Sequence, residues 1–296
     1  MKYNDLIKVI QKEYTKLSKG HRLIAEYLIN HYDTAAFMTA ASLGETVGVS
    51  ESTVVRFANV LGYEGYRELQ KELQELVKSK LTTVQRISLS SEFENFENAL
   101  REVIKKDIHN IESILKEIDY RAFHEALNIT LEANHVYILG LRSSSFLAGY
   151  LGFYLNFLLD NVKIITAGPN DVFEQLFKAN QGDVIIGISY PRYSKRTLEA
   201  LNYAKEKGCK VLTITDSLMS PANQYSDCTL IASSNMFSFV DSLVAPMSLI
   251  NAFIVALGTK KGKQITNYFE DLENIWKKHD VYITNNNNHN SDNSRE

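Results

Sequence analysis

Two short polar stretches in the second half of the chain carry residue types that bind anions. They are "GLRSSS" at 140–145 and "ISYPRYSKRT" at 188–197, and each begins where a short apolar run ends. Hydroxyl groups can donate hydrogen bonds to a phosphate without adding charge, and helix N-termini offer it unpaired N–H groups. Because parallel strands bring their carboxyl ends to one edge of a sheet, we expect the two stretches to converge there.

The sequence therefore predicts one split anion site. Its main hydroxyl donors are Ser143, Ser144, Ser189 and Ser194. Weaker candidates in the same loops are Gly140, Arg142, Arg192 and Thr197. We expect Arg192, Lys195 and Arg196 to surround the mouth of the site, although a solvated position suits Lys195 better. Helix capping needs only one serine, so capping alone is an incomplete account of three in a row.

The sequence shows no clear pattern for catalysis, for a cofactor site or for a metal site. Sugar-phosphate isomerisation needs a positioned general base, and the sparse candidates, His124, His135, Glu174 and Glu199, form no evident acid/base pair. The stretch "GLRSSS" lacks the G-x-G-x-x-G spacing of dinucleotide sites. The two cysteines lack metal-ligand spacing, and a reduced chain is the simplest interpretation, with a single disulfide left open. We expect no enzyme, no cofactor and no bound metal.

The stretch "AASLGETVGVSESTVVRFANVLGY" at 40–63 predicts two short helices joined at Gly48. We expect Ser50 to cap the second helix by accepting a backbone N–H, and Gly62 to end it. The apolar residues expected to face inward are Leu43, Val47, Val49, Val54, Phe57, Ala58 and Leu61. This spacing matches a helix-turn-helix, in which a sharp turn sets two helices at a steep angle.

The outward face of the second helix carries groups that can bond phosphates or base edges. These candidate DNA-binding residues are Ser50, Glu51, Ser52, Thr53, Arg56 and Asn59. The alternative is a solvated helix in an ordinary bundle. Residues 1–77 hold nine Lys or Arg and ten Asp or Glu, so the domain is not basic overall. Binding would then depend on a local face and on two copies meeting successive half-sites.

The pattern along the chain predicts the elements that position these residues. A length of 296 residues favours two domains. Apolar residues recur at helical spacing from Leu17 to Lys78, whereas from Val136 short apolar runs alternate with helical stretches, as in a parallel α/β sheet. The predicted fold is an all-α helix-turn-helix domain followed by an α/β three-layer domain with a parallel sheet. The boundaries are 1–77, a hinge and linker helix at 78–122, the α/β domain at 123–265, a C-terminal helix at 266–283 and a disordered tail at 284–296.

We expect a cytoplasmic protein with no membrane partner. The N-terminus has a lysine inside its apolar run and no cleavage signature. The richest apolar window, "LAGYLGFYLNFLL", has about 13 residues against roughly 20 for a membrane span, and fits a buried helix better. The net charge of −3 gives no global cue toward nucleic acid, so any polyanion must meet a local patch.

Both halves resemble known families. The segments "VSESTVVRF" and "LGYEGYREL", within residues 1–77, resemble the N-terminal helix-turn-helix domain of the RpiR family of bacterial transcription regulators. The two serine loops, with "ITDSLMSPANQYSD", are similar to the SIS (sugar isomerase) domain over about residues 123–263. Members of that family bind phosphosugars at these two loops. The resemblance thus implies that Ser143, Ser144, Ser189 and Ser194 bind the phosphate of a sugar-phosphate effector.

The second loop departs from the usual S-x-S-G-x-T pattern of SIS domains, because Pro191 stands at the second serine and Arg192 at the glycine. Neither residue reproduces the backbone freedom of glycine cheaply, which puts the phosphate pose in question. The variant resembles RpiR loops and favours a sensor over an enzyme. The resemblance implies a homodimer, or a dimer of dimers, that binds double-stranded operator DNA and a sugar phosphate. The alternatives are a phosphosugar isomerase with an accessory helical domain, and a DNA-binding protein that uses the SIS fold only to dimerise.

Overall fold

The computed structural model describes residues 6, 9–10, 13–80, 96–218, 220–235 and 239–283. It forms a helical unit and an α/β unit, each with its own hydrophobic core. Residues 81–95, which hold most of the predicted hinge, and the predicted disordered tail at 284–296 lie outside the described residues.

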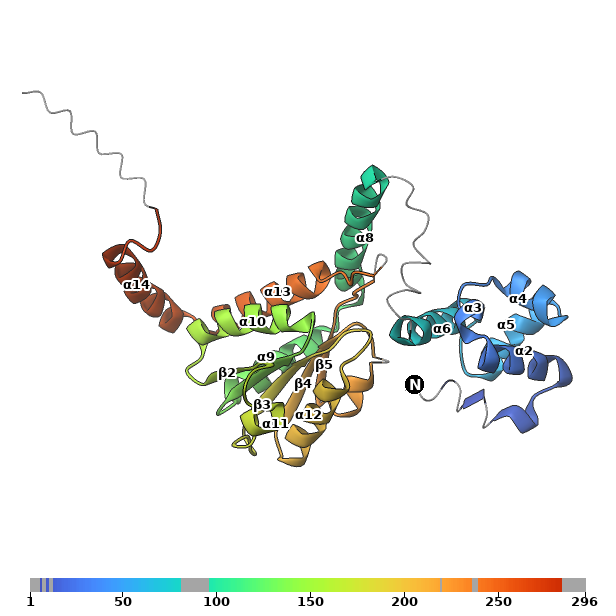
Figure 1. The fold of residues 1–296 in the computed structure, drawn as a ribbon, viewed down its shortest axis with the longest axis horizontal. Helices are drawn as coiled ribbons and strands as arrows, with labels where there is room; N and C mark the ends of the chain where they lie inside the picture. The colour runs from blue at the N-terminus through green and yellow to red at the C-terminus, as the bar shows by residue number, and fades with distance from the viewer. Residues whose placement is uncertain are drawn as a thin grey trace, which may run out of the picture.

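The N-terminal unit is helical throughout its described residues (Figure 1). Its α-helices are α2 (Lys19–Asn30), α3 (Tyr32–Ala35), α4 (Ala40–Val47), α5 (Glu51–Val60) and α6 (Tyr66–Lys80). Gly48 ends α4 in the left-handed conformation, with φ of 76°, and Gly62 does the same after α5, with φ of 93°. A Cβ on Gly44 would lie 2.7 Å from the Val49 carbonyl oxygen, so α4 and α5 meet closely. The predicted helix-turn-helix is confirmed.

The second unit contains one parallel five-stranded sheet in the order β2-β1-β3-β4-β5. The strands are β1 (Val136–Gly140), β2 (Val162–Ile165), β3 (Val184–Ile188), β4 (Lys210–Thr215) and β5 (Cys228–Ile231). The central strands β1 and β3 pair in register from Val136 with Val184 to Gly140 with Ile188. The two loops that follow β1 and β3 therefore leave the sheet side by side.

Helices cover both faces of the sheet, which confirms the predicted three layers (Figure 1). On one face pack α9 (Tyr120–Glu132), α10 (Ser144–Leu158) and α13 (Val244–Lys261). On the other face pack α11 (Val172–Gln175), α12 (Lys195–Glu206) and the short 3-10 helix η2 (Pro221–Gln224). Successive residues of β1 alternate between these faces, because Ile138 belongs to the first core and Tyr137 and Leu139 to the second.

Two helices frame the α/β unit in sequence. The linker helix α8 (Phe96–Glu117) precedes it and packs against α13. The C-terminal helix α14 runs from Lys263 to Lys278, so it begins and ends earlier than the predicted 266–283. No helix within the described ranges is both long and apolar enough to cross a bilayer. Cys209 and Cys228 are buried free thiols, and burial raises the pKa of each to about 11.

Candidate functional site

A cleft opens where β1 and β3 end, as the sequence predicts for the split site. Its volume is about 420 Å³, within the ~300–1,000 Å³ typical of ligand pockets. Its lining residues are Leu141, Arg142, Ser143, Ser144, Ile188, Ser189, Tyr190, Pro191, Arg192, Ser194, Thr197 and Asp241. All four predicted hydroxyl donors are among them. Three of the four weaker candidates are too, and only Gly140 is not.

Gly140 instead shapes the first loop. A Cβ at this position would lie 2.4 Å from the carbonyl oxygen of Ser144, so glycine lets α10 start directly against the end of β1. The helix begins at Ser144. Ser143 stands at the N-cap but makes no capping bond, while Ser145 donates to the Arg142 carbonyl at 2.6 Å. Capping therefore does not occupy the Ser143 hydroxyl.

Ser189, directly after β3, places a buried side-chain hydroxyl at the cleft. Two hydrogen bonds fix its backbone. The Ser189 N–H donates to the Ile214 carbonyl (3.1 Å), and the Ser189 carbonyl accepts from the Thr215 hydroxyl (2.7 Å). The side chain is buried, and its Oγ has no hydrogen-bond partner among the described residues. An unsatisfied buried hydroxyl costs ~1–3 kcal/mol. The fold holds a ready hydrogen-bonding group at the cleft wall.

Ser194 lines the same cleft from the start of α12. It is the N-cap, and its hydroxyl accepts from the Thr197 N–H at 3.4 Å, a long bond. The helix starts at Lys195, and Thr197 in its first turn is buried. Two helix N-termini, those of α10 and α12, thus converge on the cleft, and both favour an anion there.

Arg142 and Arg192 both line the cleft in the left-handed backbone conformation, with φ of 57° and 66°. Such a conformation costs an arginine ~1–2 kcal/mol relative to its usual regions. Arg192 thus adopts the left-handed conformation that glycine permits, at the cost in strain that the sequence predicts. The loop also gains a cation at this position.

Arg196 does not lie at the mouth as predicted, whereas Lys195 has the solvated position that the sequence favours for it. Arg196 pairs with Asp171 and stacks over Phe173, with its guanidinium carbon 4.4 Å from the ring centroid. Lys195 is solvated and lies 3.5 Å from the Glu199 carboxylate. Being helical, these residues follow the surface of α12 instead of turning into the cleft. Asp241, in contrast, lines the cleft from the β5–α13 connection, and sequence reasoning missed it.

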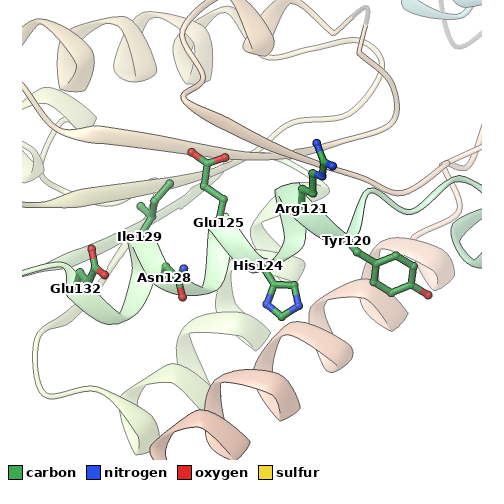
Figure 2. A pocket seen from close by; sticks show the side chains of 7 residues that line it. All are labelled: Tyr120, Arg121, His124, Glu125, Asn128, Ile129 and Glu132. Carbon is green, nitrogen blue, oxygen red and sulfur yellow. The ribbon is translucent and has the colours of Figure 1, made fainter.

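The residues considered as general bases have structural or exposed positions. His135 bonds the buried Asp183 at 2.9 Å, and Glu174 closes a capping box with Asp171 at the start of α11. A second hollow, of about 610 Å³, runs along α9 and includes His124 (Figure 2). Figure 2 shows its seven labelled side chains projecting from this one helix in different directions, with no common point of convergence.

The outward face of α5 agrees with the sequence pattern. Glu51, Ser52, Arg56 and Asn59 are exposed and Thr53 is half-buried. The expected backbone cap by Ser50 is wrong: its hydroxyl bonds those of Ser52 (2.9 Å) and Thr53 (2.8 Å) instead.

Two further groups belong to the same region. With its side-chain nitrogen turned toward them, the Asn59 amide can donate to the carbonyl oxygens of Tyr63 (3.1 Å) and Glu64 (3.3 Å) in the turn after α5. His21 lines a hollow with Ser50, Thr53 and Arg56. Partial burial, followed by the charge of Arg56, lowers the pKa of His21.

Comparison with family models identifies both units. The model of the SIS domain matches residues 130–256, and that of the helix-turn-helix domain of the rpiR family matches residues 4–80. The chain belongs to the RpiR family of transcriptional regulators. The regulator HexR of Pseudomonas aeruginosa is 24% identical over 264 residues, which cover 87% of this chain and 90% of HexR.

Solved structures agree on the fold. The sugar isomerase domain of an RpiR transcription factor from Sphaerobacter thermophilus is 25% identical, with a TM-score of 0.56, and covers 58% of this chain and 97% of that domain. NanR of Vibrio vulnificus, solved with ManNAc-6P, is 18% identical with a TM-score of 0.56, over 94% of this chain and 100% of NanR. The relatives are regulators, which confirms the prediction that the chain is not an enzyme.

Proposed function

We propose that this RpiR-family regulator binds a phosphosugar effector in the cleft of its SIS domain and that the effector alters operator binding. The observation that carries the proposal is the buried Ser189 hydroxyl, which has no partner among the described residues and faces a cleft that also holds Ser143, Ser144 and Ser194. Hydroxyls at two helix N-termini suit a phosphate dianion. The complex of NanR with ManNAc-6P supports this ligand class.

The helical unit would bind double-stranded operator DNA through α5. Arg56 can bond a guanine edge or a phosphate, while Ser50, Ser52 and Thr53 offer hydroxyls to the backbone. Glu51 and Asn59 remain weaker candidates on this face, because a carboxylate repels phosphates and Asn59 already supports the turn. We also place the regulator in the cytoplasm, with the chromosome it would bind.

A homodimer, or a dimer of dimers, would place two copies of α5 on successive half-sites. The α/β unit exposes large apolar side chains on α10 and α13, including Phe146, Phe153 and Val255 at 74%, 57% and 68% exposure. Clustered exposed apolar residues are typical of protein interfaces. The effector would favour one arrangement of the dimer, and operator DNA would change effector affinity by the same factor.

The first test is thermal unfolding of the full chain with a panel of hexose and pentose phosphates. A ligand at 100 times its Kd stabilises by ~2.7 kcal/mol, or roughly 5–10 °C in Tm. We expect a shift with at least one sugar phosphate and its loss in Ser189→Ala plus Ser194→Ala. Ser248→Ala is the matched control, because its hydroxyl bonds the Val244 carbonyl on α13, away from the cleft.

The result also separates the alternatives. No shift in the wild type with any member of the panel would favour a DNA-binding protein whose SIS fold serves only dimerisation. Conversion of one sugar phosphate into another by the purified chain would favour an isomerase.

A further inference from the structure

The connection between β5 and α13 brings a carboxylate to the cleft. Asp241 is half-buried and lines the cleft together with hydroxyl residues and two arginines. It is the one acidic residue in that lining within the described residues. A carboxylate disfavours a nearby phosphate and can only accept hydrogen bonds. Asp241 therefore suits the sugar end of the ligand, where hydroxyl groups donate.

The next residue ties the same connection to the linker helix. The Ser242 hydroxyl donates to Asp107 Oδ1 of α8 at 2.5 Å, and the Ser242 carbonyl accepts from the Ser234 hydroxyl at 2.7 Å. Hydrogen bonds to charged groups stabilise a fold more than those between neutral groups. The segment that carries Asp241 is thus held to α8 one residue away from the cleft.

A second pair of contacts, a few residues earlier, reinforces the attachment. Asn110 of α8 is fully buried, and its side-chain oxygen accepts from the Asn235 amide at 2.9 Å. The Asn110 amide donates back to the Asn235 carbonyl at 3.4 Å. Buried polar groups with fixed partners specify one arrangement. Two points of the connection, Asn235 and Ser242, therefore hold one turn of α8.

The linker helix is well placed to carry a signal. It begins at Phe96, after the helical unit in sequence, and the attached residues Asp107 and Asn110 lie in its middle. Its exposed Leu100, Ile104 and Ile108 precede or flank the attachment. A small movement of the β5–α13 connection would therefore act on the helix that leads back to the DNA-binding unit.

We propose that Asp241 and Ser242 form a relay from the effector cleft to the linker helix. Asp241 recognises hydroxyl groups on the sugar of the bound phosphosugar, and Ser242, with Asn235, transmits its position to α8 through Asp107 and Asn110. This proposal rests on the proposed function, and it adds a residue that selects for the sugar and a route out of the cleft. Inorganic phosphate fills the serine site without engaging the relay.

Hydrogen exchange by mass spectrometry on the full chain tests the relay. The probes are inorganic phosphate and the sugar phosphate that gives the largest thermal shift, with ManNAc-6P and glucose 6-phosphate in the panel. We expect both probes to slow exchange in the loops at 141–146 and 189–197, and only the sugar phosphate to slow it at 107–113 of α8. In Ser242→Ala the loops stay protected and α8 does not. Asp107→Ala, which removes the partner of Ser242 on α8, gives the same result. Ser248→Ala behaves as wild type.

Affinity measurements test the sugar contact. In Asp241→Asn we expect the affinity for the sugar phosphate to fall about tenfold, or ~1.4 kcal/mol, while that for inorganic phosphate stays or rises because a negative charge is removed. Equal losses for both probes overturn the role of Asp241. Protected loops with an unaffected α8, or α8 protection that survives both relay variants, overturn the relay and leave the proposed function standing. No protection of the loops by any probe overturns the proposed function itself.

Discussion

The two units each place hydroxyl groups near the start of a helix, but the two sets of hydroxyls differ in their hydrogen bonding. At α5 the hydroxyls of Ser50, Ser52 and Thr53 bond one another near the surface. In the cleft the Ser189 hydroxyl is buried without a partner among the described residues, and Ser143 makes no capping bond. The first cluster is satisfied before any ligand arrives. The second contains a buried hydroxyl that a bound ligand could supply with a hydrogen-bond partner.

This difference indicates how each surface gains binding energy. DNA would exchange with water and with local hydroxyl contacts at α5, so affinity there depends on charge and falls with salt. A phosphosugar would satisfy an existing deficit in the cleft, so affinity there depends on geometry.

Gly140→Ala should damage the cleft without reaching α5. Its Cβ would lie 2.4 Å from the Ser144 carbonyl oxygen, a backbone atom, and such overpacking costs ~1–3 kcal/mol. We expect a lower unfolding temperature for the α/β unit and loss of the ligand shift. DNA affinity without ligand should stay within about twofold, because the helical unit has its own core.

Gly149→Ala, in the helix α10 that follows Gly140, is the control, because a Cβ at Gly149 meets no atom within 4 Å. It should raise stability by up to ~1 kcal/mol. Equal destabilisation by the two changes would contradict the close approach at Gly140.

Arg56→Ala should act only on the DNA side. We expect operator affinity to fall by ~1–3 kcal/mol and, where a phosphate contact is lost, the salt slope to fall by about one. The ligand-induced shift in Tm should be unchanged. Fluorescence anisotropy over a salt series measures both quantities. Unchanged affinity with intact folding would mean that the assignment of the DNA-binding face to α5 is wrong.

Ser189→Ala should stabilise the ligand-free protein while abolishing the ligand shift. Removing a buried hydroxyl without a partner relieves a desolvation cost, so the free energy of unfolding should rise by ~1 kcal/mol. Ser52→Ala in the other cluster should change it by less than ~0.5 kcal/mol, because the residue is exposed. Denaturant unfolding without ligand separates the two. A loss of stability in Ser189→Ala would show that its hydroxyl is already satisfied.

Arg192→Gly should have a small effect on folding. Relief of the left-handed strain, ~1–2 kcal/mol, is largely offset by the greater freedom of glycine in the unfolded chain. We expect a gain of about 0.5 kcal/mol together with weaker binding of the sugar phosphate. Arg192→Ala keeps the strained backbone and loses the cation. It should therefore bind the sugar phosphate weakly and show no gain in stability. Equal stabilities of the two variants would contradict a strained backbone at this position.

The sequence predicted what periodicity and topology determine. Helical spacing separated the inward residues of α5 from the outward ones, and the rule that parallel strands end at one edge brought Ser143 and Ser189 together. It missed what depends on side-chain geometry: the Ser50 hydroxyl bonds neighbouring hydroxyls, and Arg196 follows its helix to Asp171. Asp241 was not predicted as a cleft residue, because it lies in a connection that has no hydrophobic period and no motif. Only the folded chain brings it to the cleft.

One measurement joins the effector cleft and the DNA-binding surface. Duplexes that bind the full chain are selected from a random pool, and the affinity for the best one is measured with and without the sugar phosphate that shifts Tm. The account predicts a change of at least about fivefold, the lower end of usual coupling energies, in the wild type and none in Ser189→Ala. A sugar phosphate that binds the wild type at the cleft yet leaves DNA affinity unchanged would contradict it.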